Sequence, residues 1–319
     1  MRSTFHITFA LILLGLLVTF AEPASAMDTS CDGAQVSQTN TLGPGPEQRC
    51  IKPGTGAREW FKDCPTCPEM VVIPAGSFMM GSERADNAKP IHRVTIAKLF
   101  AVGKYSVTRG EFAAFVNDSG YTMQAGCVAF KFVQGVLGAT VGSNASWNSP
   151  GFDQSDRHPV VCVNWGDARS YVDWLSKKSG EAYRLLTEAE YEYSARAGTT
   201  TPYFWGEYIG RNQANCSECG SQWEKAGTAP VGSFAGNNFG LHDVHGNAAT
   251  WVEDCYHPNY QDAPTDGSAW LLGNCTKRVY RGGSWIDKLS LLDAASRNDA
   301  SPLVRFNTVG IRVVRALTR

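Results

Sequence analysis

Beyond its first 20 residues, the 319-residue chain has no apolar run long enough to span a membrane. Basic residues are not in excess, because 29 Lys and Arg face 30 Asp and Glu and the formal net charge is −1. Nucleic acid is therefore not expected as a partner. The glycine fingerprint of flavin- and nicotinamide-binding strand–helix units is missing. So are the Gly-x-Ser-x-Gly and His-Glu-x-x-His motifs, which argues against hydrolases.

The amino terminus has the pattern of a secretory signal peptide. Met1-Arg2 precedes an apolar stretch from Phe5 to Phe20, and the small residues Ala24-Ser25-Ala26 follow. A membrane anchor is the alternative, but the apolar stretch is short and ends directly at the cleavage pattern. We expect residues 1–26 to be removed, leaving a periplasmic or secreted protein without a membrane span.

The chain has 10 cysteines, all after residue 26. An even number in an exported protein predicts disulfides, although the sequence alone does not fix their connectivity. Candidate pairs are Cys255 with Cys275, Cys127 with Cys162, and Cys31 with Cys50. Two Cys-x-x-Cys motifs, at 64–67 and 216–219, would suggest zinc or redox chemistry in a cytosolic chain. Disulfides are the preferred interpretation of both motifs here.

Composition predicts one loop-rich globular domain behind a flexible arm. The chain is 43% hydrophobic, with 9 Trp and 15 Phe for a core, whereas 32 Gly and 15 Pro indicate many turns. Residues 27–66 have few large apolar side chains and are expected to form the arm, and residues 67–319 the domain. Short strands are predicted from Met70 to Gly76, from His92 to Ile96 and from Leu99 to Val102.

Three helix starts are marked by capping residues. Thr108 with Glu111 and Thr187 with Glu190 have the spacing of a capping box, and Asn164 can cap a helix in a similar way. The second helix should pack through one apolar stripe, formed by Ala168, Tyr171, Val172 and Leu175. The third helix is predicted to end at Gly198.

Several segments between Met70 and Val314 resemble, in order, those of the formylglycine-generating enzyme, or sulfatase-modifying-factor, family. They are Val72-Ile73-Pro74-Ala75-Gly76-Ser77-Phe78, His158-Pro159-Val160-Val161-Cys162-Val163-Asn164-Trp165, Arg184-Leu185-Leu186-Thr187-Glu188-Ala189-Glu190-Tyr191-Glu192-Tyr193, Ala229-Pro230-Val231-Gly232-Ser233-Phe234, Gly240-Leu241-His242-Asp243-Val244-His245-Gly246-Asn247, Arg281-Gly282-Gly283-Ser284-Trp285 and Gly310-Ile311-Arg312-Val313-Val314. The resemblance implies an α+β fold related to C-type lectins, with little regular secondary structure and tightly bound calcium.

The resemblance also locates a catalytic region from which the reactive residues are missing. Active members follow the Gly-Gly-Ser-aromatic motif with two cysteines that bind copper(I), a metal that prefers soft thiolates. The corresponding residues here are Asp287 and Leu292, so copper is not expected. By matching to the family, the remaining groove would be lined by Ser284, Trp285, Asp287, Arg297 and Asn307. The alternative is a tight turn with Trp285 in the core.

Two calcium loops are implied by the same comparison. The first matches Asp243, Gly246, Ala248 and Thr250, and the last of these replaces a glutamate of the family. The second begins at Asn215 and the carbonyl of Cys216, and its later acidic ligand aligns poorly, near Trp223 or Glu224. The alternative for the first loop is a set of turn hydrogen bonds. His242, His245 and His257 could also hold a metal, but they are more simply explained as turn residues.

Two functions are compatible with these residues. The first is a non-canonical or catalytically silent accessory, maturation or binding module that recognises a partner enzyme or peptide in the exported compartment. The alternative is a metal-dependent oxidoreductase that makes formylglycine from a sulfatase cysteine or oxidises another substrate with oxygen. Turnover of a C-x-P-x-R peptide would distinguish the second function from the first.

Overall fold

The computed structural model describes residues 35–39, 47–51, 60–124 and 126–317. The expected signal peptide and the proposed Cys31–Cys50 pair lie outside the described residues. In the segment expected to be an arm, β1 (Gln35–Thr39) pairs with β2 (Glu47–Ile51) as an antiparallel hairpin. The end of that segment belongs to the folded body, because Phe61 is fully buried and exchanges backbone hydrogen bonds with Met70.

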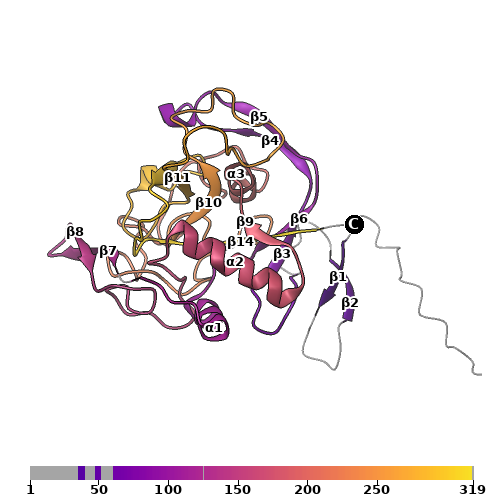
Figure 1. Ribbon diagram of the computed structural model, residues 1–319. Coiled ribbons are helices and arrows are strands. Elements are labelled where there is room, and N and C mark those ends of the chain that lie inside the picture. The colour runs from indigo at the N-terminus through magenta and orange to yellow at the C-terminus, as the bar shows by residue number, and fades with distance from the viewer. Residues whose placement is uncertain (1–34, 40–46, 52–59, 125, 318–319) are drawn as a thin grey trace, which may run out of the picture.

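Two four-stranded sheets form the centre of the fold (Figure 1). The first has the order β3–β6–β14–β9 and is antiparallel throughout; its strands are β3 (Met70–Ile73), β6 (Phe100–Gly103), β9 (Tyr183–Leu185) and β14 (Val313–Ala316). The second has the order β12–β11–β10–β13, built from β10 (Ala249–Cys255), β11 (Arg278–Arg281), β12 (Arg297–Ala300) and β13 (Val309–Gly310). Its β10–β13 contact is parallel.

Hairpins and short turns complete the described part. The hairpin of β4 (Gly76–Met80) and β5 (His92–Ile96) lies at the top of Figure 1, and that of β7 (Cys127–Val133) and β8 (Val136–Ser143) projects at its left. Two 3₁₀ turns are η1 (Asp86–Ala88) and η2 (Leu289–Leu291). Residues 197–248 contain no helix or strand. The prediction of a loop-rich α+β fold is confirmed.

The three expected helices form with the expected caps. They are α1 (Arg109–Ser119), α2 (Trp165–Ser179) and α3 (Glu188–Arg196), and each opens with a complete capping box. In α2 the reciprocal partner of Asn164 is Asp167, whose carboxylate accepts from the Asn164 amide at 2.8 Å. The third helix ends two residues earlier than predicted, because Ala197 already adopts the left-handed conformation with φ 45°.

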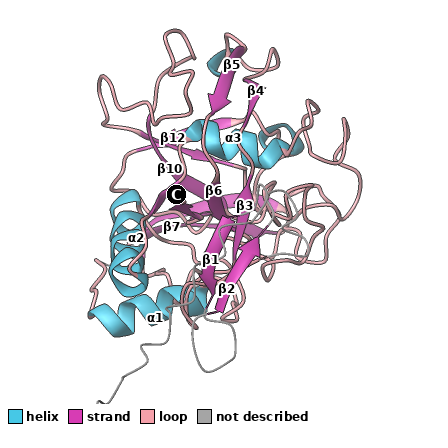
Figure 2. Cartoon of the chain, turned by 90° about the vertical axis from the view of Figure 1, so that its right-hand side faces the viewer, coloured by secondary structure: helices cyan, strands magenta, loops and turns pink. Residues whose placement is uncertain are grey.

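The first sheet is buried on both faces, which explains its continuous apolar runs. Successive strand residues point to opposite faces, so Val72 and Val71 belong to different core clusters. One face is covered by α1 and α2, whose apolar stripe is buried as predicted, and the other by α3. Figure 2 shows α1 and α2 together on one side of the sheets and α3 on another.

Four disulfides staple the described loops. They join Cys64 to Cys67, Cys127 to Cys162, Cys216 to Cys219 and Cys255 to Cys275, and no described cysteine is free. The predicted pairs Cys127–Cys162 and Cys255–Cys275 are confirmed. Both Cys-x-x-Cys motifs form disulfides, as expected. Closing loops in this way restricts the unfolded chain and suits a fold with few regular elements.

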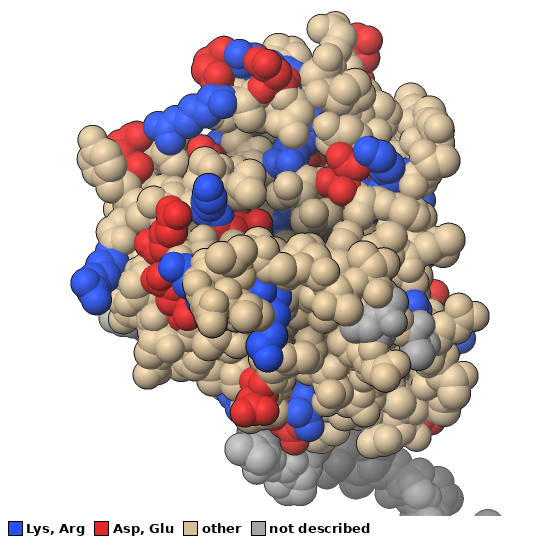
Figure 3. Space-filling model, turned by 90° about the vertical axis from the view of Figure 1, so that its left-hand side faces the viewer, with Lys and Arg blue, Asp and Glu red and all other residues tan. Residues whose placement is uncertain are grey.

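No helix in the described residues is both long and apolar enough to cross a membrane. On the face shown in Figure 3, basic and acidic side chains are interspersed between broad uncharged areas. That face has no extended basic surface of the kind that tracks a phosphate backbone.

Candidate functional site

The Gly-Gly-Ser-Trp motif forms a tight turn directly after β11. Gly282 and Gly283 have φ angles of 100° and 67°, a region that glycine adopts without steric cost. A Cβ at Gly282 would overlap the Tyr191 hydroxyl, so the close packing also requires glycine. Trp285 is 1% exposed, and its indole N–H donates to the Asn307 carbonyl at 3.1 Å. The motif is thus a tight turn with a buried tryptophan, and a groove beside it stays a prediction.

Asp287, at the first copper-cysteine position, is tied into this turn. Its Oδ2 accepts from the Ser284 hydroxyl at 2.7 Å. Its carbonyl accepts from both the amide and the hydroxyl of Ser217 at 3.0 Å. Burial raises the pKa of Asp287, and the Ser284 hydrogen bonds oppose that shift. A single hard carboxylate is a poor substitute for a copper(I) thiolate pair.

Leu292, at the second copper-cysteine position, is fully buried against the Cys216–Cys219 disulfide. Because all described cysteines are in disulfides, no cysteine from elsewhere supplies a free thiolate here in the described residues. The chain's residues in this region thus do not fit a copper(I) centre.

His245 is a buried residue of this region, and the sequence did not reveal its burial or its unpartnered ring nitrogen. Its Nδ1 donates to the Leu292 carbonyl at 2.6 Å, while its buried Nε2 has no hydrogen-bond partner in the described part of the chain. The ring is enclosed by aromatic side chains, with centroids 5.6 Å away for Tyr203 and 5.1 Å for Trp205. Burial lowers the pKa of His245 to about 4, so the imidazole is neutral with a free lone pair at pH 7. The interpretation as a simple turn residue misses this environment.

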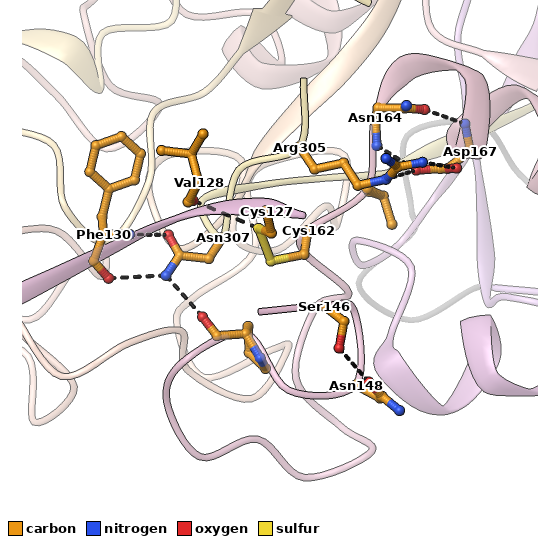
Figure 4. The surroundings of a disulfide bond; sticks show 12 residues. Cys127, Val128, Phe130, Ser146, Asn148, Cys162, Asn164, Asp167, Arg305 and Asn307 are labelled. Atoms are coloured by element: carbon orange, nitrogen blue, oxygen red, sulfur yellow. Dashed lines mark hydrogen bonds and ion pairs between the residues drawn. A yellow bond between two sulfur atoms is a disulfide. The ribbon is translucent and has the colours of Figure 1, made fainter. Parts of the chain in front are cut away.

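Asn307 contacts the β7–β8 hairpin through its side chain (Figure 4), and its backbone carbonyl accepts from Trp285 of the turn. Its amide donates to the carbonyls of Phe130 and Pro150 at 3.0 Å, and its oxygen accepts from the Phe130 amide at 3.0 Å. The disulfide between Cys127 and Cys162 fixes the base of the same hairpin. Asn307 thereby acts as an extra strand residue along the outer edge of β7.

Of the five residues expected around a groove, Arg297 has its contacts elsewhere. Its guanidinium binds Glu188 through two hydrogen bonds, of 2.6 and 2.9 Å, and lies 4.1 Å from the Tyr260 ring centroid. Ser284, Trp285, Asp287 and Asn307 are brought together, whereas Arg297 belongs to a buried ion network with Arg281.

The first calcium loop has one feature that suits a hard cation. Asp243 adopts a left-handed φ of 54°, and its Oδ2 accepts from the Gly232 amide at 2.7 Å. Its Oδ1 is buried without a hydrogen-bond partner among the described residues. Burial raises the pKa of this carboxyl, against the opposing Gly232 N–H and Arg312 charge. Thr250 is also buried, in β10.

The described residues do not gather three or more His, Cys, Asp or Glu side chains around one point. Backbone carbonyls at Gly246 and Ala248 would therefore have to complete the coordination of Asp243, and calcium accepts such carbonyl ligands. His242 and His257 bind different carbonyls, those of Phe234 and Cys255.

The second loop has its polar atoms engaged inside the protein. The Asn215 side chain donates to the Gly227 carbonyl at 2.9 Å and accepts from the Ser221 hydroxyl at 2.8 Å. Its backbone carbonyl accepts from the Asn247 amide at 2.8 Å. Cys216 is in a disulfide. The disulfide involves only the Cys216 side chain and not its backbone carbonyl, so calcium at this second loop stays a prediction.

Comparison with known proteins places this geometry in a family. Residues 57–317 match the sulfatase-modifying factor enzyme 1-like domain, which is most of the chain. The chain belongs to this family. The formylglycine-generating enzyme of Mus musculus is 32% identical over 291 residues, covering 76% of this chain and 74% of that protein. The inactive C-alpha-formylglycine-generating enzyme 2 of Mus musculus is 30% identical over 267 residues, covering 72% of this chain and 80% of that one.

Solved structures support the same fold. PvdO from Pseudomonas aeruginosa is 38% identical, with a TM-score of 0.69 over 83% of this chain and 99% of that one. CarF has the same fold at 21% identity, with a TM-score of 0.56 over 79% of this chain and 100% of that one. This family member is thus similar both to proteins named as enzymes and to one named as inactive.

Proposed function

We propose that this family member is exported and acts as an accessory, maturation or binding module for a peptide or partner enzyme, without the copper-dependent oxidation. The observation that carries the proposal is the pair Asp287 and Leu292, which stand where thiolates are needed, in a region whose described cysteines are all oxidised. The surrounding scaffold is nevertheless intact, from the Gly-Gly turn to the Asn307 contacts with the hairpin. One fold can carry different functional sites, so this chain can keep the family's fold and have a different function.

The oxidoreductase alternative has one observation in its favour. The neutral imidazole of His245 has an unpartnered nitrogen beside Leu292, and neutral imidazole is a common metal ligand and a general base. This single nitrogen does not make a copper(I) site in the described residues. The imidazole could still act as one metal ligand or as a general base in an oxidation.

Metal analysis, peptide retention and peptide turnover together test the two functions. Protein comprising residues 27–319 would be purified from an oxidising compartment without chelator and incubated with a C-x-P-x-R peptide under oxygen. We expect retention of a peptide or partner protein, no aldehyde product, no oxygen uptake and no stoichiometric copper. About one copper per chain together with turnover would overturn the proposal. The double variant Asp287→Cys, Leu292→Cys is the matched control, because it restores both thiols on the same scaffold.

We also propose that calcium binds at the loop of Asp243, Gly246, Ala248 and Thr250. The unpartnered buried oxygen of Asp243 supports this assignment, since calcium prefers oxygen ligands. Calcium should raise the unfolding temperature of the wild type and a chelator should lower it. Asp243→Asn should lose most of that response. An equal response in the variant would show that calcium acts elsewhere.

A further inference from the structure

The loop that carries the Cys216–Cys219 disulfide also forms a separate cavity. The cavity has a volume of about 480 Å³ and is lined by Arg211, Asn212, Gly220, Gln222, Trp223 and Ser233. This volume is within the usual range for small-ligand sites. Five of the six residues lie outside the groove and the calcium loops implied by the family resemblance, and the sixth, Trp223, lies where the second calcium loop aligns poorly.

The cavity offers hydrogen-bond donors around one positive charge. Arg211 is its only charged lining residue, and its guanidinium has no ion pair or hydrogen bond with any described residue. Among the described residues the neighbouring acid Glu224 forms no ion pair with Arg211; its carboxylate accepts from the Gly220 amide at 2.5 Å and pairs with Lys225 at 3.6 Å. The guanidinium is therefore available to an anion from outside.

Three uncharged lining side chains are available as well. Within the described part of the chain, the side-chain amides of Asn212 and Gln222 and the indole N–H of Trp223 have no protein partner. The Trp223 ring packs against Phe234, with centroids 6.0 Å apart, which fixes one wall of the cavity. An aromatic wall beside a guanidinium and two amides can bind a ligand that has a flat polar group and an adjoining apolar part.

The backbone around Arg211 is held in place before any ligand arrives. The Asn212 amide donates to the Cys219 carbonyl at 2.7 Å, across the turn closed by the disulfide with Cys216. The Arg211 stem lies against Gly220, where a Cβ would come within 2.8 Å of its Cγ. Asn212 itself has a left-handed φ of 57°, and such conformations persist where the surroundings enforce them. Pre-positioned groups lose less entropy on binding.

We propose that this cavity is a carboxylate-binding site that recognises an acidic group of a peptide, either its C-terminus or an acidic side chain. The inference rests on the proposed binding role and names the ligand class. A planar guanidinium binds a carboxylate through two parallel hydrogen bonds. A phosphate site would normally add further cations, whereas Arg211 is alone in this lining. The two amides can pair with the N–H and C=O groups of a peptide backbone.

The experiment is a titration of ¹⁵N-labelled protein, residues 27–319, with N-acetyl-Ala-Ala as the free acid and as the C-terminal amide. The reporter is the indole N–H signal of Trp223, assigned with Trp223→Phe. We expect a saturable shift with the acid and none with the amide. Arg211→Gln should weaken binding of the acid by about tenfold or more, the loss expected for a charged hydrogen bond. Arg93→Gln, an exposed arginine on β5, is the matched control and should bind as the wild type does.

Equal shifts with acid and amide, or equal affinity in the Arg211→Gln and Arg93→Gln proteins, would overturn the assignment. Glucuronate distinguishes a second source of carboxylate: binding of the sugar acid without binding of the peptide acid would overturn the peptide part. Failure of the carboxylate site can be distinguished from failure of the proposed binding function. A chain that retains a partner peptide equally well with and without Arg211 would refute the site and leave the binding role intact.

Discussion

Glu192 in α3 is the position where a single-atom exchange should most clearly reveal what holds this fold together. The side chain is fully buried, and its Oε2 accepts from Arg281 at 2.6 Å. Its Oε1 accepts from the Gly81 amide at 2.9 Å and from two nitrogens of Arg196 at 2.9 and 2.8 Å. One carboxylate thus joins β11, α3 and the turn after β4.

The substitution Glu192→Gln keeps the shape and removes the charge. One amide oxygen would remain for three donor groups, and the new NH₂ would face N–H donors. Arg281 is itself fully buried, so it would keep only Glu188, at 3.2 Å, as an ionised partner. Removing one partner from a buried ion pair costs about 3–5 kcal/mol. For a domain of this size, that loss corresponds to an unfolding temperature lower by roughly 6–20 °C.

The assay is urea unfolding with the disulfides intact, followed by circular dichroism. Glu207→Gln is the matched control, since Glu207 pairs with Arg84 at 2.9 Å while their side chains are 53% and 59% exposed. Exposed pairs contribute less than about 1 kcal/mol. If the two variants lose the same free energy of unfolding, the network contributes little and this account of the fold is wrong.

Three further changes test the candidate region. Asn307→Leu leaves the amide and carbonyl of Phe130 and the carbonyl of Pro150 unpaired and should cost about 3 kcal/mol in urea unfolding, against little loss for an exposed Asn→Leu change. Gly282→Ala forces a side chain into φ 100° against Tyr191 and should destabilise by more than about 2 kcal/mol, measured in the same way. Because burial lowers the pKa of His245 to about 4 from 6.5, the unfolded state binds more protons as pH falls from 6.5 to 4, and stability should fall. Between pH 7 and 5 the wild type should lose about 2 kcal/mol more than His245→Phe; equal losses would contradict the neutral imidazole.

Local signals predicted the regular elements well. Each expected helix begins at its predicted cap, because a capping box is satisfied by residues three apart and needs no tertiary information. The strands at Met70 and His92 were predicted from runs of β-branched residues that end in turn-forming residues. The end of α3 was misplaced, since tertiary packing holds Ala197 in a conformation that local propensity assigns to glycine.

The candidate site was harder to predict because its contacts join distant segments. Arg297 was matched to the groove by its place in the family pattern, but its partner Glu188 is 109 residues away. Asn307 was expected to line a groove, whereas it closes the edge of β7 through Phe130, 177 residues away. Nothing near His245 in the sequence shows that aromatic rings and the Leu292 carbonyl enclose it.

The turn after β11 shows how the catalytic side chains could change while the scaffold remained. Asp287 and Leu292 hold neighbouring segments through their backbone carbonyls, which accept from Ser217 and His245. Those bonds are independent of the side chain at either position, so replacing two cysteines leaves them available. The side chain of Leu292 then fills core space beside Cys216, which adds burial where metal ligation would need room. Asp287 and Leu292 at the two cysteine positions of the family are therefore compatible with a stable turn, and the proposed binding role is better sought in the solvent-facing loops.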